Sequence, residues 1–190
     1  GTRAPPGVAV MQGVRDRWRS HASHVVGCLS GGAYISEPDP LGVPLLDVDV
    51  RGHFEVVIVE GKELKNMELF GQQDPYCIVV LGAASARTKT VPYGGKNPKW
   101  PADGGTVEVP CGGALESGTN LLHIRIFDAD KCREDDFVGE ACLNASTLIA
   151  MEAFAGEVQV YRRGTKPRGR LSVEVRWRPA GDSAVPSEDL

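Results

Sequence analysis

The residues most suited to chemistry lie in one acidic segment, residues 127–137, which reads FDADKCREDDF. Five carboxylates fall within nine positions there, and each repels the others and resists desolvation. Asp128 and Asp130 lie two residues apart at the end of an expected strand, so both side chains face the same way. Asp136 can meet them if the residues between form a loop. Such hard oxygen donors suit Ca²⁺, which takes about six to eight oxygen ligands; the alternative is a solvated acidic loop.

A second acidic position precedes another expected strand. Glu68 and Asp74 are six residues apart, and Asp74 is followed by Pro75 and Tyr76. The proline fixes a stiff start to the strand. Asp-Pro-Tyr is a weak signal by itself and becomes informative together with the acidic segment.

Motifs of common catalytic sites are absent from the sequence, which has no GxSxG, HExxH or phosphate-binding loop. Its histidines, at 21, 24, 53 and 123, show no ligand or triad spacing, and His123 falls inside a strand pattern. The five cysteines form no CxxC pair, which argues against a disulfide scaffold or a zinc site and favours a reducing compartment. We therefore predict that the protein is not an enzyme.

The elements that must position the acidic residues are short β-rich runs separated by turns. We expect eight strands, and a β-sandwich built from them, at residues 53–59, 76–81, 87–91, 106–109, 121–127, 138–143, 157–161 and 171–177. One helical segment is expected over residues 145–154. The 23 glycines and 13 prolines fit a chain that turns often.

Composition narrows the class of protein further. The chain has 190 residues, of which 42% are hydrophobic, and a formal net charge of −4. A buried core is therefore expected, and no apolar run approaches the roughly 18 residues of a membrane span. The sequence pI of about 5.6 argues against binding nucleic acid by bulk charge.

The two ends of the chain have a different pattern. Residues 1–50 form an expected N-terminal extension, in which Val10, Val14 and Trp18 make a weak helical stripe beside three arginines. The stripe, over residues 8–23, is read as an amphipathic helix for a membrane surface or a partner groove, as a remnant of an Arg-rich targeting segment, or as a mobile arm. A protein partner would contact residues 8–26. The acidic tail, residues 180–190, is expected to be disordered.

Four motifs in order resemble the C2 domain, the calcium- and phospholipid-binding sandwich found in protein kinase C and synaptotagmin. The resemblance covers about residues 51–179 and is strongest to single-domain plant and protist members. It rests on the first loop at residues 62–76, a basic strand at 87–90, an Asn-Pro-x-Trp turn at 97–100, and the third loop with its following strand at 127–130 and 136–140.

The resemblance implies an all-β fold, an eight-stranded antiparallel Greek-key β-sandwich in which the first and third loops meet at one end. The family's calcium ligands would be Glu68, Asp74, Asp128, Asp130 and Asp136, with Glu68 standing where Asp is usual. Arg133 occupies a place where some members supply an oxygen ligand, and a guanidinium cannot ligate. We expect one or two calcium ions rather than three.

The implied function is calcium-dependent, peripheral binding to an anionic phospholipid membrane from the cytoplasm, in eukaryotic signalling or trafficking. Candidate lipid-contacting residues are Leu69, Phe70, Lys131, Arg133, Arg87 and Lys89, and a second basic stretch runs from Arg162 to Arg170. The resemblance names no organelle, and a processed organellar form is one of the alternatives. The alternative is a calcium-independent C2-type scaffold, held in a larger assembly through its N-terminal arm.

Overall fold

The computed structural model of the protein describes residues 50–68, 71–113, 120–130, 133–162 and 167–181. The predicted N-terminal helix, and the acidic tail from residue 182 onward, lie outside these residues. The strands are β1 (Val50–Lys62), β2 (Pro75–Leu81), β3 (Ala84–Arg87), β4 (Thr106–Gly113), β5 (Leu121–Asp128), β6 (Asp136–Asn144), β7 (Ala153–Tyr161) and β8 (Pro167–Pro179); the helices are α2 (Ala102–Gly105) and α3 (Ala145–Met151). Neither of these two helices has the length and apolar content needed to cross a bilayer.

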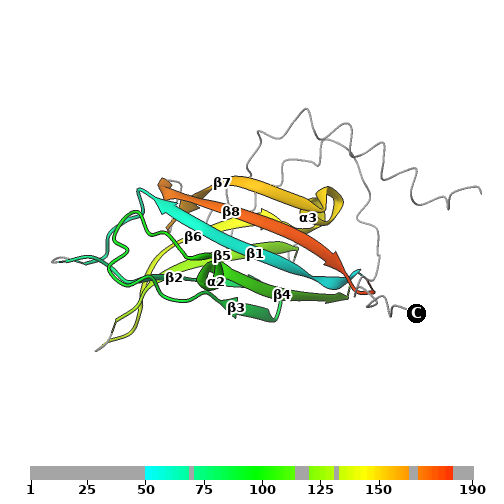
Figure 1. The fold of residues 1–190 in the computed structure, drawn as a ribbon, viewed down its shortest axis with the longest axis horizontal. Helices are drawn as coiled ribbons and strands as arrows, with labels where there is room; N and C mark the ends of the chain where they lie inside the picture. Colours follow the sequence, from blue (N-terminus) through cyan, green and yellow to red (C-terminus); the bar gives the residue numbers. More distant parts are fainter. Residues whose placement is uncertain (1–49, 69–70, 114–119, 131–132, 163–166, 182–190) are drawn as a thin grey trace, which may run out of the picture.

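The eight strands pair in the order β3-β2-β5-β6-β7-β8-β1-β4, and every pairing is antiparallel. The ladder between β6 and β7 has one paired position, Glu140 with Tyr161, so the strands divide into two four-stranded layers (Figure 1). The chain crosses between the layers after β1, β3, β4 and β6. The predicted all-β fold with eight antiparallel strands is confirmed.

The core lies between the layers because each strand turns alternate residues inward. In β5, Leu122, Ile124 and Ile126 are fully buried, while the residues between them are not. Trp100 is buried, and its indole Nε1 donates a 3.0 Å hydrogen bond to the carbonyl of Lys89, which satisfies its polar atom.

Two predicted elements differ from the structure. The strand expected at residues 87–91 is β3, which begins at Ala84 directly after a two-residue turn whose first residue, Gly82, has φ of +56°. It ends at Arg87, because Thr88 Oγ1 accepts the hydrogen bond from the amide of Cys77 and interrupts the ladder. The helix expected to reach residue 154 ends at Met151, and the short helix α2 was not expected.

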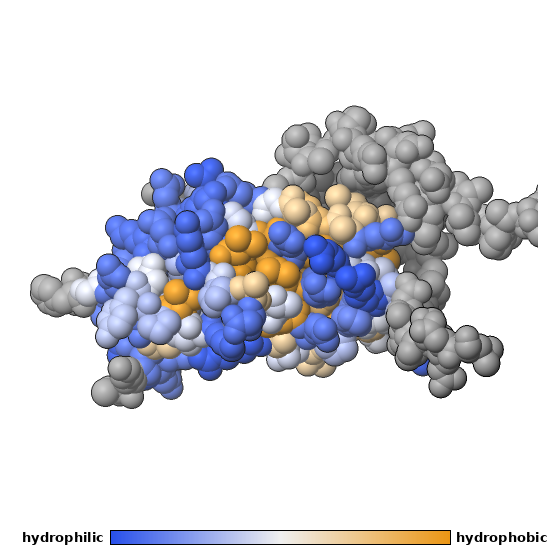
Figure 2. All heavy atoms as spheres, viewed as in Figure 1, coloured by the Kyte–Doolittle hydropathy of each residue, from blue (hydrophilic) through white to orange (hydrophobic). Residues whose placement is uncertain are grey.

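Adjacent strand ends gather the acidic residues at one end of the sandwich. Asp128, the last residue of β5, pairs with Pro75 on β2 and with Asp136 on β6. The chain segments that follow β1 and β5 project from this same end, at the left of Figure 1. Hydrophilic residues cover much of it in the space-filling view (Figure 2).

Candidate functional site

Asp74 and Asp128 join the first loop to the third. The amide of Asp74 donates a 2.7 Å hydrogen bond to Asp128 Oδ1, and the amide of Ala129 donates to the carbonyl of Asp74 at 3.0 Å. Asp74 Oδ1 also accepts a 2.6 Å hydrogen bond from the amide of Tyr93, whose φ of 54° is left-handed. The carboxylate of Asp74 therefore also helps to hold the segment after residue 91.

Asp128 has the most unusual environment in the site. Only 1% of the residue is exposed, and its Oδ2 atom has no hydrogen-bond partner among the described residues. Burial raises the pKa of its carboxyl group; the hydrogen bond from Asp74 opposes the shift, and the charges of Glu68, Asp130 and Asp74 add to it. A buried carboxylate oxygen without a partner is costly, and a cation would satisfy it.

Asp135 organises the loop that carries Asp130. Its Oδ1 atom accepts a 2.9 Å hydrogen bond from the amide of Asp130, and its Oδ2 atom accepts one of 2.6 Å from the hydroxyl of Tyr76. The hydrogen bond from Tyr76 and the one from the Asp130 amide lower the pKa of Asp135. Sequence reasoning counted this carboxylate in the acidic segment but gave it no role, because its partners depend on how the loop closes.

Arg133 lies among the carboxylates rather than beside them. Its Nε atom donates a 2.8 Å hydrogen bond to Asp130 Oδ2, and its Nη2 atom lies 3.1 Å from Asp136 Oδ2 and 3.4 Å from Glu68 Oε1. The hydrogen bond to Asp130, followed by the charges of Asp130 and Asp136, raises the pKa of the guanidinium. Arg133 is an internal counter-ion for three of the five predicted ligands.

The structure thus brings all five predicted ligand residues to one end, where Glu68 is joined to the third loop through Arg133. Leu69, Phe70 and Lys131 lie outside the described residues.

The other predicted lipid-contacting cations have partners within the chain. Arg87 lies over the ring of Tyr76, 3.6 Å from its centroid, and Lys89 Nζ lies 2.7 Å from Asp103 Oδ2.

A basic cleft of about 630 Å³ opens near the start of the first loop. Among the described residues, the cationic side chains that line it are those of Lys65, Lys96, Arg168 and Arg170. Backbone hydrogen bonds close its walls, from Leu64 to the carbonyl of Lys96 at 3.0 Å and from Lys65 to that of Arg168 at 3.2 Å. The sequence places Arg168 and Arg170 in a basic stretch, but it carries no signal that the first loop meets them.

Comparison with known proteins agrees with this architecture. Residues 52–160 match the C2 domain family. The chain is a C2 domain protein. The C2 match begins within β1 and extends through most of β7, so it contains the whole acidic end described above.

Several plant proteins are similar to this C2 chain. Elicitor-responsive protein 3 of Oryza sativa subsp. japonica is 25% identical over 133 residues, which cover 70% of this chain and 88% of that protein. Protein C2-DOMAIN ABA-RELATED 11 of Arabidopsis thaliana is 31% identical over 109 residues, which cover 57% of this chain and 60% of that protein.

Solved structures share the fold. A C2 domain-containing protein from a putative elicitor-responsive gene aligns with a TM-score of 0.56 at 25% identity, covering 72% of this chain and 96% of that one. The calcium-bound tandem C2 domains of extended synaptotagmin 2 align with a TM-score of 0.56 at 20% identity, covering 68% of this chain and 47% of that one. At 20% identity the likeness concerns the fold alone.

The donor set of this C2 end fits a hard divalent cation. Carboxylate oxygens are what Ca²⁺ binds, and Oδ2 of Asp128 is a buried oxygen that lacks a partner among the described residues. Arg133 supplies positive charge to three of these carboxylates. The arrangement can therefore hold either a metal ion or its own guanidinium.

Proposed function

We propose that the protein is a calcium-dependent, non-catalytic module that binds anionic phospholipid surfaces peripherally, from the cytoplasm. The observation that carries this proposal is the buried Oδ2 of Asp128, which has no partner among the described residues. Asp128 lies on β5 between Pro75 of β2, which directly follows Asp74, and Asp136 of β6. Membership of the C2 family supports it, and a protein of the same fold, extended synaptotagmin 2, has been solved with calcium bound.

The proposed calcium ligands are the carboxylates of Glu68, Asp74, Asp128, Asp130 and Asp136. Bound calcium would neutralise these groups and leave open coordination positions for a lipid phosphate. The chain's own part is to hold the carboxylates in place. Asp74 and Asp128 are fixed by backbone hydrogen bonds between the two loops, and Asp135 fixes the backbone of Asp130.

Arg133 gives the proposed site a second state. Its side chain is 57% exposed, so it can leave the carboxylates without disturbing the core. Bound calcium would neutralise the carboxylates and so weaken their attraction for the Arg133 guanidinium. Arg133 would then be free to contact an anionic headgroup. A cation near such a surface contributes about 1 kcal/mol to binding. Leu69, Phe70 and Lys131 stay predictions for the same membrane-facing loops.

A second candidate function is the calcium-independent protein-interaction scaffold. The observation that favours it is the set of contacts between Arg133 and Glu68, Asp130 and Asp136, since a built-in counter-ion can stabilise the loops without any metal. The proposed anchor in this case is the N-terminal arm, residues 8–26.

Two measurements distinguish the membrane module from the scaffold. They are calorimetry with calcium and co-sedimentation with phosphatidylserine vesicles in calcium or chelator. Heat of binding together with calcium-dependent pelleting supports the membrane module. No heat and no calcium-dependent pelleting would overturn the membrane proposal and leave the scaffold.

A further inference from the structure

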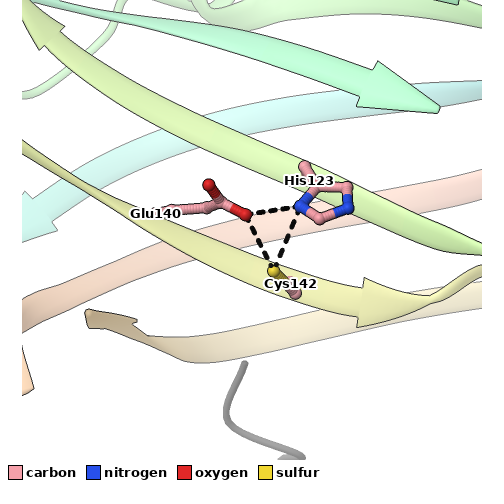
Figure 3. Close-up of side chains that lie close together, drawn as sticks. All are labelled: His123, Glu140 and Cys142. Carbon is pink, nitrogen blue, oxygen red and sulfur yellow. Dashed lines mark hydrogen bonds and ion pairs between the residues drawn. The ribbon is translucent and has the colours of Figure 1, made fainter. Parts of the chain in front are cut away.

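Three side chains of metal-binding type meet on the face of β5 and β6 opposite the core. Figure 3 shows His123 of β5 pointing toward Glu140 and Cys142 of β6. Their ligand atoms, Nδ1, Oε1 and Sγ, all lie within 4.8 Å of one another. His123 is about 16 Å along the strand from Asp128, at roughly 3.3 Å per residue. The cluster is therefore separate from the acidic end.

The register of the two strands produces this cluster. Asp128 pairs with Asp136 and Phe127 with Phe137, and the same register continued would place Ala141 opposite His123. A register shift between Ile126 and Phe127 places Cys142 there instead. A shift of one residue exchanges the side chains on each face of a strand, so the bulge determines that the thiol meets the imidazole.

We propose that His123, Glu140 and Cys142 form a site for a thiophilic divalent ion of the zinc type. Imidazole nitrogen, thiolate and carboxylate are the donors that zinc takes in proteins, and three protein ligands leave a fourth position for water. Calcium prefers oxygen donors alone, so this site and the acidic end select different metals. Binding would release the proton of the Cys142 thiol and leave His123 neutral, with its proton on Nε2.

The two spacings from the Cys142 sulfur fit tetrahedral coordination. Cys142 Sγ lies 3.4 Å from His123 Nδ1 and 3.3 Å from Glu140 Oε1. Zinc bonds of about 2.3 Å to sulfur and about 2.0 Å to nitrogen or oxygen, at tetrahedral angles, separate such donors by about 3.5 Å. His123 Nδ1 and Glu140 Oε1 are hydrogen-bonded to each other, and the ion would replace that contact.

A neighbouring residue prepares the carboxylate. Arg125 Nε lies 3.3 Å from Glu140 Oε2, which leaves Oε1 directed at the other two ligands. Burial raises the pKa of Glu140, but hydrogen bonds from His123 and Cys142 and the charges of His123 and Arg125 outweigh it, so the pKa lies below its usual value. The side chain is 18% exposed and that of His123 is 26% exposed, so an ion can reach the site from solvent.

The test is a titration of the reduced, chelator-treated full chain with Co²⁺ and then with Zn²⁺. We expect one cobalt equivalent to give a thiolate-to-cobalt charge-transfer band that zinc abolishes. Cys142→Ser should remove the band and lower zinc affinity at least about tenfold. The matched control is Cys111→Ser, a change at a buried cysteine on β4, which should leave both unchanged. The absence of a cobalt band in the unaltered chain would overturn the proposal, as would a band that persists in Cys142→Ser.

Two further variants separate a metal site from simpler explanations. His123→Gln alters a part-exposed position, so it guards against a folding defect at the buried Cys142, and it must also lose at least about tenfold in zinc affinity. An undiminished affinity in this folded variant contradicts the site. Asp128→Asn with Asp130→Asn must retain zinc binding, because these carboxylates belong to the other end; loss there would assign the ion to the acidic end and refute the proposal.

Discussion

Arg133 Nε donates a 2.8 Å hydrogen bond to Asp130 Oδ2, so a permanent positive charge lies inside the acidic end of the sandwich. Nη2 of the same guanidinium reaches Asp136 and Glu68. Five carboxylates in one place repel one another, and Arg133 offsets part of that repulsion. For the proposed calcium site this residue is both a stabiliser and a competitor.

Replacing Arg133 by Gln should therefore strengthen calcium binding while weakening the membrane contact. Without the guanidinium, calcium no longer competes with a positive side chain for the carboxylates. We therefore expect the affinity for calcium to rise about three- to tenfold in calorimetry. Without calcium, stability should fall only slightly, because exposed ion pairs contribute little.

The control for this change is Arg178→Gln. Arg178 is an exposed arginine that lies 3.3 Å from Glu55 Oε2. It stands near the end of β8, opposite His53 at the start of β1, and so at the other end of the sandwich. The control should leave calcium affinity unchanged. Weaker calcium binding in Arg133→Gln would contradict the role of competitor.

Asp128→Asn together with Asp130→Asn should abolish the response to calcium and stabilise the chain in its absence. Burial is the main cause of the raised pKa of Asp128, so its ionised carboxylate destabilises the folded state at neutral pH. The neutral amide of Asn removes that cost. The unaltered chain should gain about 2.7 kcal/mol at calcium concentrations of 100 times the dissociation constant, and the double variant should gain nothing. Thermal unfolding with calcium or chelator measures both effects.

Asp103→Asn is the matched control for that experiment. Asp103 is an exposed acid, paired with Lys89, and its loss should leave the calcium-induced shift in place. A double variant that still gains stability from calcium would exclude these two carboxylates as ligands.

The strands and the carboxylates could be predicted because their signals are local. Alternation in residues 121–127 predicts β5, and Asp74 and Asp128 follow from short motifs at strand ends. The contact of Arg133 with Glu68, 65 residues away in the chain, depends on how two loops close. The meeting of His123 with Cys142 depends on a bulge, and one residue of register has no clear signal in the sequence. That is why the sequence argued against a zinc site.

Tyr76→Phe should loosen the third loop without altering the core. The hydroxyl of Tyr76 donates a 2.6 Å hydrogen bond to Asp135, which in turn accepts from the amide of Asp130. Loss of the hydroxyl should cost about 1 kcal/mol in chemical denaturation and weaken calcium binding severalfold, because Asp130 is less firmly held. The control is Tyr93→Phe, since Tyr93 is 75% exposed and contacts Asp74 through its backbone amide. Equal effects of the two changes would refute a specific role for the Tyr76 hydroxyl.

The basic cleft should contribute to membrane binding more than the surface around Lys89 and Lys99. Lys65 and Lys96 line the cleft near the first loop, whereas Lys89 and Lys99 each lie near a carboxylate, of Asp103 at 2.7 Å and Glu60 at 3.8 Å. At about 1 kcal/mol per lysine, Lys65→Gln with Lys96→Gln should weaken binding to phosphatidylserine vesicles about tenfold or more and leave calcium binding in solution unchanged. Lys89→Gln with Lys99→Gln removes the same charge, and its loss should be smaller because two carboxylates already offset it. If the second pair weakens vesicle binding more than the first, the surface around Lys89 and Lys99, and not the cleft, contacts the lipid.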